Sequence, residues 1–175
     1  MRKLMAVVIT GAMLAGATAQ AQMRRGGVVT GSCARMTATP AGTLDAAETA
    51  GLVFTREEEK LARDVYLALH ETWQAAVFVQ IAGAEQRHMD ATKGLLDRYG
   101  IADPVGANPV GVFADPKLAS LYVELVAKGR VSLADALTVG ATIEDLDLAD
   151  VDALAAASEN ADLDLATTAV LRASV

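Results

Sequence analysis

The sequence predicts an all-α domain, a four-helix bundle whose helices are joined by a long crossover connection. Alanine and leucine are abundant, whereas aromatic residues make up only 4% of the chain and β-branched residues do not cluster. Apolar residues recur at steps of three or four along several segments. Residues 101–116 hold three of the four prolines, so this stretch is too irregular for a helix and long enough to cross a bundle.

The first 21 residues are predicted to be a secretory signal peptide. Arg2 and Lys3 precede an apolar run at residues 4–17, and small residues up to Ala21 suit cleavage. The run is shorter than the about 20 apolar residues of a membrane span, and no other membrane segment is visible. We therefore expect a periplasmic or secreted protein with no membrane span after cleavage. Residues 22–50 are predicted to be a flexible linker with a helical turn at its end, before a domain at 51–175.

Charge and cysteine content narrow the function further. Cleavage after Ala21 would leave 13 basic and 22 acidic residues, so the formal charge would change from −7 to −9. Such an acidic chain is not expected to bind nucleic acid. The single cysteine, Cys33, cannot form an internal disulfide, so stability has to come from the helical core.

Local signals predict the ends of the first three helices. Thr55 and Glu58 have the form of a capping box that starts a helix running to about Trp73. A second helix is expected from near Val77 to Gly100, because glycine suits the left-handed C-terminal position. A third, short helix is expected to start at Asp115-Pro116 and to end by Gly129.

The last part of the chain is predicted to be helical as well. Ser132 with Asp135 caps a helix that continues towards Leu148. Further helical pieces are expected at residues 149–157 and from residue 161 to the end.

Glu85 and His88 lie one turn apart on the apolar stripe of the second predicted helix. The stripe consists of Phe78, Ile81, Glu85, His88, Thr92, Leu95 and Tyr99. A buried carboxylate without a partner costs several kcal/mol, so Glu85 needs a cation, a proton or a strong donor. The two residues are therefore either metal ligands or a hydrogen-bonded pair that satisfies both groups without metal.

Two further carboxylates are candidate ligands. Glu59 shares a helix face with Ala62, Tyr66 and Leu69 or His70, although Glu59 alone would pass for a surface acid. Its neighbours Glu57 and Glu58 are expected in a solvated first turn.

Glu144 interrupts an apolar stripe of the fourth predicted helix. That stripe consists of Leu133, Leu137, Ala141, Glu144, Leu148 and Val151. The carboxylate could also cap a helix or pair with an arginine. Bundles that bind two metal ions need inward carboxylates and Glu-x-x-His pairs, and Glu59, Glu85, His88 and Glu144 supply at least half of that set. Tyr66 is either a core tyrosine with a bonded hydroxyl or a residue that transfers electrons or protons.

Three sequence blocks together resemble the DUF2202 family of ferritin-like proteins. They are EEEKLARDVY at 57–66, AEQRHMD at 84–90 and VGATIEDLD at 139–147, and the similarity covers about residues 52–171. The resemblance implies a ferritin-like bundle with Glu59, Glu85, His88 and Glu144 at a di-iron or similar dimetal site. It also implies that Tyr66 lies close by, as the candidate catalytic residue. The activity of the family is poorly defined, so the resemblance says more about fold than about function.

The last helix departs from the family pattern. In the family it carries a histidine that resembles the second imidazole ligand, whereas this sequence ends at Val175 without one, and the last helix is expected to be truncated. Thr167 and Thr168 replace bulkier or acidic residues. The sequence is then a fragment, the product of a frameshifted gene, or a natural one-metal or metal-free variant.

Two hypotheses about function follow. The first is a metal-binding protein that holds one or two ions of iron, or of another transition metal such as manganese, without an organic cofactor. As an enzyme it would be a ferroxidase, oxidising Fe(II) with dioxygen or peroxide. The second is a metal-free interaction or scaffold module. Its incomplete fourth helix would leave an apolar groove for a partner helix or for a second copy in a homo-oligomer.

Overall fold

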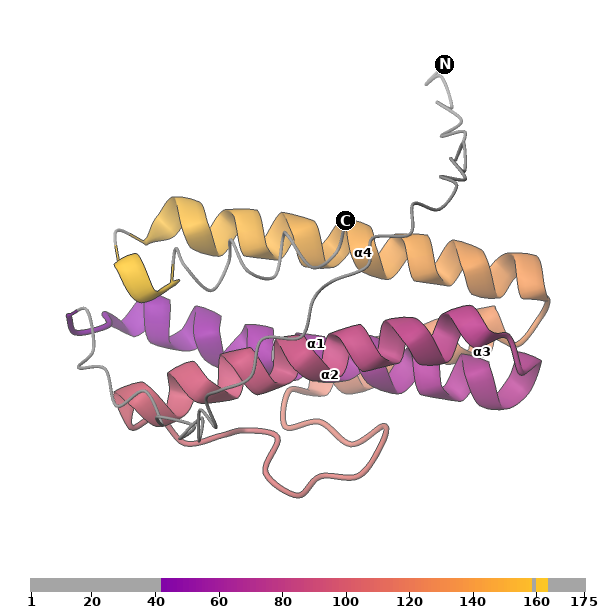
Figure 1. Cartoon of the computed structure of the whole chain (residues 1–175), viewed down its shortest axis with the longest axis horizontal. Coiled ribbons are helices and arrows are strands. Elements are labelled where there is room, and N and C mark those ends of the chain that lie inside the picture. Colours follow the sequence, from indigo (N-terminus) through magenta and orange to yellow (C-terminus); the bar gives the residue numbers. More distant parts are fainter. Residues whose placement is uncertain (1–41, 159, 164–175) are drawn as a thin grey trace, which may run out of the picture. The chain divides into compact units, whose positions relative to one another are not determined.

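The computed structural model describes residues 42–158 and 160–163, which form an all-α domain with four main helices (Figure 1). They are α1 (Ala46–Trp73), α2 (Ala76–Tyr99), α3 (Pro116–Gly129) and α4 (Leu133–Ala157). Helix α1 contacts each of the other three, and α3 also contacts α4. The all-α prediction is confirmed. The signal-peptide prediction, the linker prediction up to residue 41 and the substitutions at Thr167 and Thr168 lie outside the described residues.

None of the helices in the described part of the chain has both the length and the apolar character needed to span a membrane.

Helix α1 begins earlier than the sequence analysis predicted. Asp45 is the N-cap: its side chain accepts from the Glu48 amide, and the Glu48 side chain accepts from the Asp45 amide, both at 2.8 Å. The capping box assigned to Thr55 is wrong, because Thr55 is a buried residue inside the helix. Leu52, which packs in a small apolar cluster with residues of α2, gives the earlier turns a buried anchor.

The predictions for the next two helices are confirmed to within a residue. Helix α2 ends at Tyr99, and Gly100 adopts the left-handed conformation with φ 68°. Asp115 caps α3 by accepting from the Lys117 amide at 2.7 Å, with Pro116 in the first turn. These ends depend on local chemistry, which is why the sequence predicts them well.

The crossover at residues 101–115 is bound to α1 by buried charged side chains. Glu57 accepts hydrogen bonds from two backbone amides at the end of the crossover, at 2.6 and 2.9 Å. Lys60 donates to a crossover carbonyl at 2.8 Å and to Asp64, which also accepts from a crossover amide at 2.9 Å. The expectation that Glu57 and Glu58 form a solvated turn is therefore wrong, since both lie mid-helix and are buried.

Helix α4 packs with a different face from the one predicted. Its buried residues include Ala136, Val139 and Ile143, whereas Leu133, Leu137 and Leu148 are 43%, 51% and 40% exposed. The reason is that the first half of α4 packs with Ala136, Val139 and Ile143 in the core shared with α1 and α3, although Val151 of the predicted stripe is buried as expected. Helix α4 also runs unbroken to Ala157, so the separate helical piece at 149–157 is wrong. Of the last predicted piece, residues 161–163 are helical and the rest lies beyond the described range.

The buried Lys60–Asp64 pair is expected to be essential to stability. Replacing Asp64 by Ala leaves the Lys60 ammonium without its carboxylate, and both side chains are fully buried. The free energy of unfolding should fall by about 3–5 kcal/mol. Asp97→Ala, which breaks the exposed Lys93–Asp97 pair at the same i, i+4 spacing, should cost about 0–1 kcal/mol. Urea unfolding of both variants measures the difference, and equal losses would contradict the anchoring role of Asp64.

Candidate metal centre

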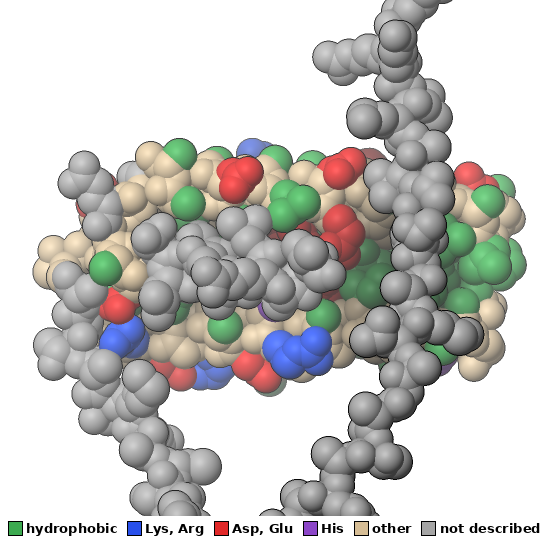
Figure 2. Space-filling model, turned by 45° about the horizontal axis from the view of Figure 1, so that its top comes forward, with side chains coloured by type: hydrophobic (Ala, Val, Ile, Leu, Met, Phe, Trp, Pro, Cys, Tyr) green, Lys and Arg blue, Asp and Glu red, His purple; other side chains and the backbone are tan. Residues whose placement is uncertain are grey.

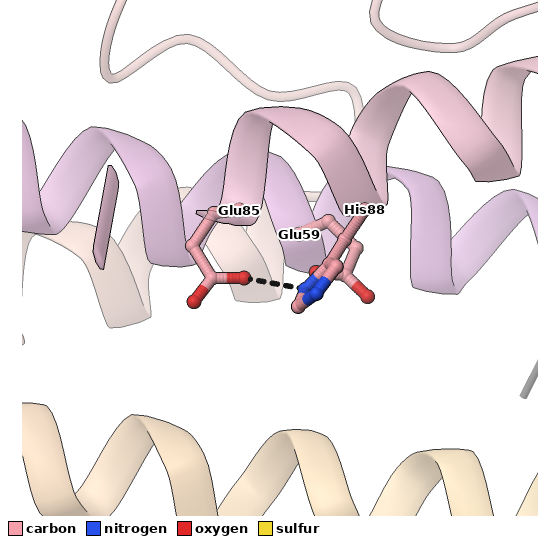
Figure 3. Close-up of side chains that lie close together, drawn as sticks. All are labelled: Glu59, Glu85 and His88. Atoms are coloured by element: carbon pink, nitrogen blue, oxygen red, sulfur yellow. Dashed lines mark hydrogen bonds and ion pairs between the residues drawn. The ribbon is translucent and has the colours of Figure 1, made fainter. Parts of the chain in front are cut away.

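Three ionisable side chains converge inside the helices. Glu59 comes from α1, and Glu85 and His88 come from α2; Figure 3 shows all three pointing towards α4. They are 2%, 3% and 6% exposed. Each offers one ligand atom, and these atoms lie within 4.8 Å of one another. The buried Glu59, Glu85 and His88 group can therefore hold a metal ion.

Hydrogen bonding alone does not satisfy this group. His88 Nδ1 lies 3.0 Å from Glu85 Oε2 and 3.3 Å from Glu59 Oε2, yet one ring nitrogen carries at most one proton. Among the described residues, Glu59 Oε2 and His88 Nε2 have no hydrogen-bond partner. The carboxylate–imidazole hydrogen bond considered as an alternative to metal ligation is present between Glu85 and His88. It leaves the second carboxylate unsatisfied, which favours a cation between the three groups.

The distances are those expected of neighbouring ligands on one ion. Two donor atoms about 2.1 Å from a transition metal, at right angles to each other, lie about 3.0 Å apart. The two Nδ1-to-carboxylate distances of 3.0 and 3.3 Å are close to that separation. Imidazole nitrogen combined with carboxylate oxygen suits iron, manganese or zinc better than calcium.

The pKa values of the group show how it is neutralised when no ion is bound. Burial lowers the pKa of His88, but the adjacent Glu59 and Glu85 carboxylates outweigh burial and raise it above the ordinary value. Burial raises the pKa of Glu59 more than His88 lowers it. A proton on the imidazole and a metal ion therefore compete for the same position between the carboxylates.

Glu144 and Tyr66 lie beside the group. The Tyr66 hydroxyl donates to Glu144 Oε1 at 2.8 Å and lies 3.2 Å from the Gly140 carbonyl. Tyr66 is fully buried, and burial followed by the Glu144 charge raises the pKa of its hydroxyl. Glu144 lines a cavity together with Glu85 and His88, although it is not one of the three converging ligands. In the described part of the chain, Glu144 therefore binds Tyr66. It neither caps a helix nor pairs with an arginine there.

Three acidic residues that the sequence did not predict as part of the site extend the cluster. They are Glu58, Asp147 and Asp150. Burial, then hydrogen bonding to Asp150, raises the pKa of Glu58 to about 9. Burial, then the charges of Glu59 and Glu85, raises the pKa of Asp147 to about 9. The three-residue steps from Glu144 to Asp147 to Asp150 are the signal that could have revealed this acidic edge of α4.

These features define an all-α protein with a buried carboxylate–histidine group that can hold a metal ion. The chain belongs to the DUF2202 family: the family model, described as an uncharacterized protein domain (DUF2202), matches residues 48–175. The family assignment made from the three sequence blocks is thereby confirmed.

The chain is also similar to a protein of Methanocaldococcus jannaschii. It is 53% identical over 116 residues to the uncharacterized protein MJ0754 of Methanocaldococcus jannaschii, covering 66% of this chain and 63% of that protein. The crystal structure of the hypothetical protein MJ0754 from Methanococcus jannaschii matches with a TM-score of 0.76 and 47% identity, covering 78% of each chain. The two chains therefore share a fold.

Stability of the metal-free protein is expected to fall as the pH rises from about 5 to about 9. Glu58 and Asp147 have folded pKa values of about 9, above their ordinary values of 4.5 and 3.8. In that window the folded protein binds protons that the unfolded chain has released, so each proton lowers stability by about 1.4 kcal/mol per pH unit. Asp147→Asn removes one of these protons, so the loss of stability per pH unit should become smaller by about 1.4 kcal/mol. Urea unfolding at several pH values after chelation measures the free energy of unfolding at each pH. A free energy of unfolding that rises with pH would contradict the buried acidic cluster.

Proposed function

We propose that this protein is a ferritin-like metal-binding protein that holds iron or manganese and oxidises Fe(II) with dioxygen or peroxide. The ligands would be Glu59, Glu85, His88 and Glu144. The observation that carries the proposal is the buried His88 Nδ1 facing two carboxylate oxygens, one of which has no hydrogen bond. A cation is the simplest group that satisfies all three atoms at once.

The order of the elements supports the ferritin-like part of the proposal. Glu59 lies on α1, the Glu85-x-x-His88 pair lies on α2, and Glu144 follows on α4 after the crossover. Di-iron carboxylate bundles have one long crossover and place a single Glu or a Glu-x-x-His pair on each core helix. The three helices thus supply, in that order, a single Glu, one Glu-x-x-His pair and a second single Glu, which is the larger part of the set that such a site uses.

A bound transition metal would supply one-electron redox chemistry. Two Fe(II) ions would each lose one electron, and one hydrogen peroxide would take up two electrons and two protons to leave as two waters. The carboxylates of Glu59 and Glu85 would balance the additional positive charge of the oxidised ion. Burial of these ligands excludes water and keeps their electrostatic interactions strong. Tyr66 would act through Glu144, by holding its carboxylate with a hydrogen bond.

Metal binding is expected to depend on Glu85 and His88. After chelation and anaerobic loading with Fe(II) or Mn(II), the full chain should retain about one or two ions, and Glu85→Ala/His88→Ala should retain close to none. At a free metal concentration of 100 times Kd, bound metal should stabilise the wild-type fold by about 2.7 kcal/mol. Elemental analysis and urea unfolding measure these effects.

The matched control uses the other histidine of the chain. His70→Ala/Glu71→Ala removes an imidazole and a neighbouring carboxylate near the end of α1, and it should bind metal like the wild type. Equal metal retention in the two double variants would contradict the proposed site. Unchanged Fe(II) oxidation by Glu85→Ala/His88→Ala would contradict the oxidase part.

Tyr66→Phe should distinguish two roles of Tyr66: positioning Glu144 through its hydroxyl and packing its ring in the core. The substitution removes only the hydroxyl that holds Glu144, so the fold should persist while Mn(II) affinity or the Fe(II) oxidation rate falls about 10- to 100-fold. Isothermal titration and stopped-flow absorbance measure the two quantities, with thermal unfolding as the control. An unchanged affinity together with an unchanged rate would show that Tyr66 is only a core residue.

The metal-free interaction module is the alternative function. The exposure of Leu133, Leu137 and Leu148 on α4 favours it, because exposed leucines along one helix suit a helical partner. A wild-type chain that retains no metal in the loading experiment would support this alternative over the metal protein.

A further inference from the structure

A cavity of about 310 Å³ opens directly beside the proposed metal site. Glu85 and His88 of α2 and Glu144 of α4 form part of its wall, together with Tyr66 of α1. A molecule that occupied this cavity would therefore contact the same side chains that are proposed to hold the ion.

The rest of the cavity wall is apolar. It is formed by Val77, Phe78, Ile81 and Ala84 of α2 and by Leu137, Gly140 and Ala141 of α4. Figure 2 shows hydrophobic side chains gathered at the end of the protein where these two helices begin, next to acidic side chains. The volume is at the lower end of the range for small-molecule sites, so the cavity suits a compact ligand.

Small residues create this space. On the α4 side the cavity is lined by two small residues, Gly140 and Ala141. A Cβ on Gly140 would lie 3.3 Å from the ring of Tyr66. Larger residues at these positions would fill the space between α4 and the proposed ligands. The cavity is thus a consequence of specific small side chains in the sequence.

The polar end of the cavity offers acceptors. The fully buried Tyr66 hydroxyl directs its proton to Glu144 Oε1, which leaves lone pairs of the half-buried Glu144 carboxylate free to accept a hydrogen bond. A ligand with a hydroxyl donor can use this carboxylate, whereas an anionic ligand would meet the negative charge of the site.

We propose that this cavity binds a small apolar molecule carrying one hydroxyl group, such as a simple alcohol or phenol, next to the metal. The inference rests on the proposed metal function and names the class of organic ligand that binds beside that centre. An apolar body fits the walls given by α2 and α4, and the hydroxyl lies at the acidic end beside Tyr66 and Glu144.

The test is fluorine NMR of 4-fluorophenol with the full-length protein, first without metal and then loaded with Mn(II) or diamagnetic Zn(II). Binding should occur in all three forms, and Mn(II) should broaden the bound fluorine signal far more than Zn(II), because paramagnetic relaxation falls steeply with distance. Fluorobenzene, which lacks the hydroxyl, should bind about tenfold more weakly.

Matched variants locate the binding. Ala141→Phe should fill the cavity and weaken 4-fluorophenol binding at least about tenfold while metal content stays unchanged. Ala84→Leu fills the same space from α2 and serves if Ala141→Phe does not fold. Ala127→Phe places the same bulk on an exposed residue of α3 and should have no effect.

The outcomes separate this inference from the proposed function. No binding of 4-fluorophenol, equal binding by Ala141→Phe, or equal line widths with Mn(II) and Zn(II) would overturn the inference even if metal binds. Cavity binding by a protein that retains no metal would overturn the proposed function and leave the ligand class intact.

Discussion

The burial of α1 on all sides between Thr55 and Ala62 is the constraint on which the rest of the structure depends. This segment carries charged residues that cannot reach water, so each needs a partner within the protein. Arg56, Glu57 and Lys60 find theirs in the crossover and in α2. Glu58 and Glu59 instead join the acidic cluster near α2 and α4. Helix α1 therefore both binds the long connection and contributes Glu59 to the site.

The division of charges along α1 also explains why the site stays acidic. Its basic residues are turned to other partners: Lys60 pairs with Asp64, and Arg63 contacts Asp64 and Gln86. Within the described residues, the ion pairs of Glu59 and Glu85 run to His88. A carboxylate cluster with one imidazole leaves a net negative charge, which protons neutralise in the metal-free protein and a metal ion would neutralise when bound.

The parts of the fold that depend on local signals could be predicted from sequence. Gly100 ends α2 and Pro116 starts α3 as expected, because backbone conformation at these residues is set by their own chemistry. The proximity of Glu85 and His88 was also predictable, since they lie one turn apart on an apolar stripe, whereas Glu59 was placed with them only by the resemblance to the DUF2202 family.

The remaining features depend on partners distant in sequence. Glu57 is buried because its carboxylate accepts hydrogen bonds from the backbone amides of Ala114 and Asp115. These partners are far away in the sequence, so no local pattern reveals them. The face of α4 was misassigned because leucine spacing alone does not show that α1 and α3 pack against Ala136, Val139 and Ile143. Asp147 was missed since its environment comes from Glu59 and Glu85 on other helices.

The most direct measurement of the central claim is the anomalous scattering of Mn(II) in crystals of the metal-loaded protein. If Glu59, Glu85 and His88 bind the ion, a peak should lie about 2.1–2.2 Å from His88 Nδ1 and from carboxylate oxygens of Glu59 and Glu85. Peaks confined to exposed acids such as Asp97, with a hydrogen-bonded Glu85–His88 pair and no ion between the three side chains, would contradict it.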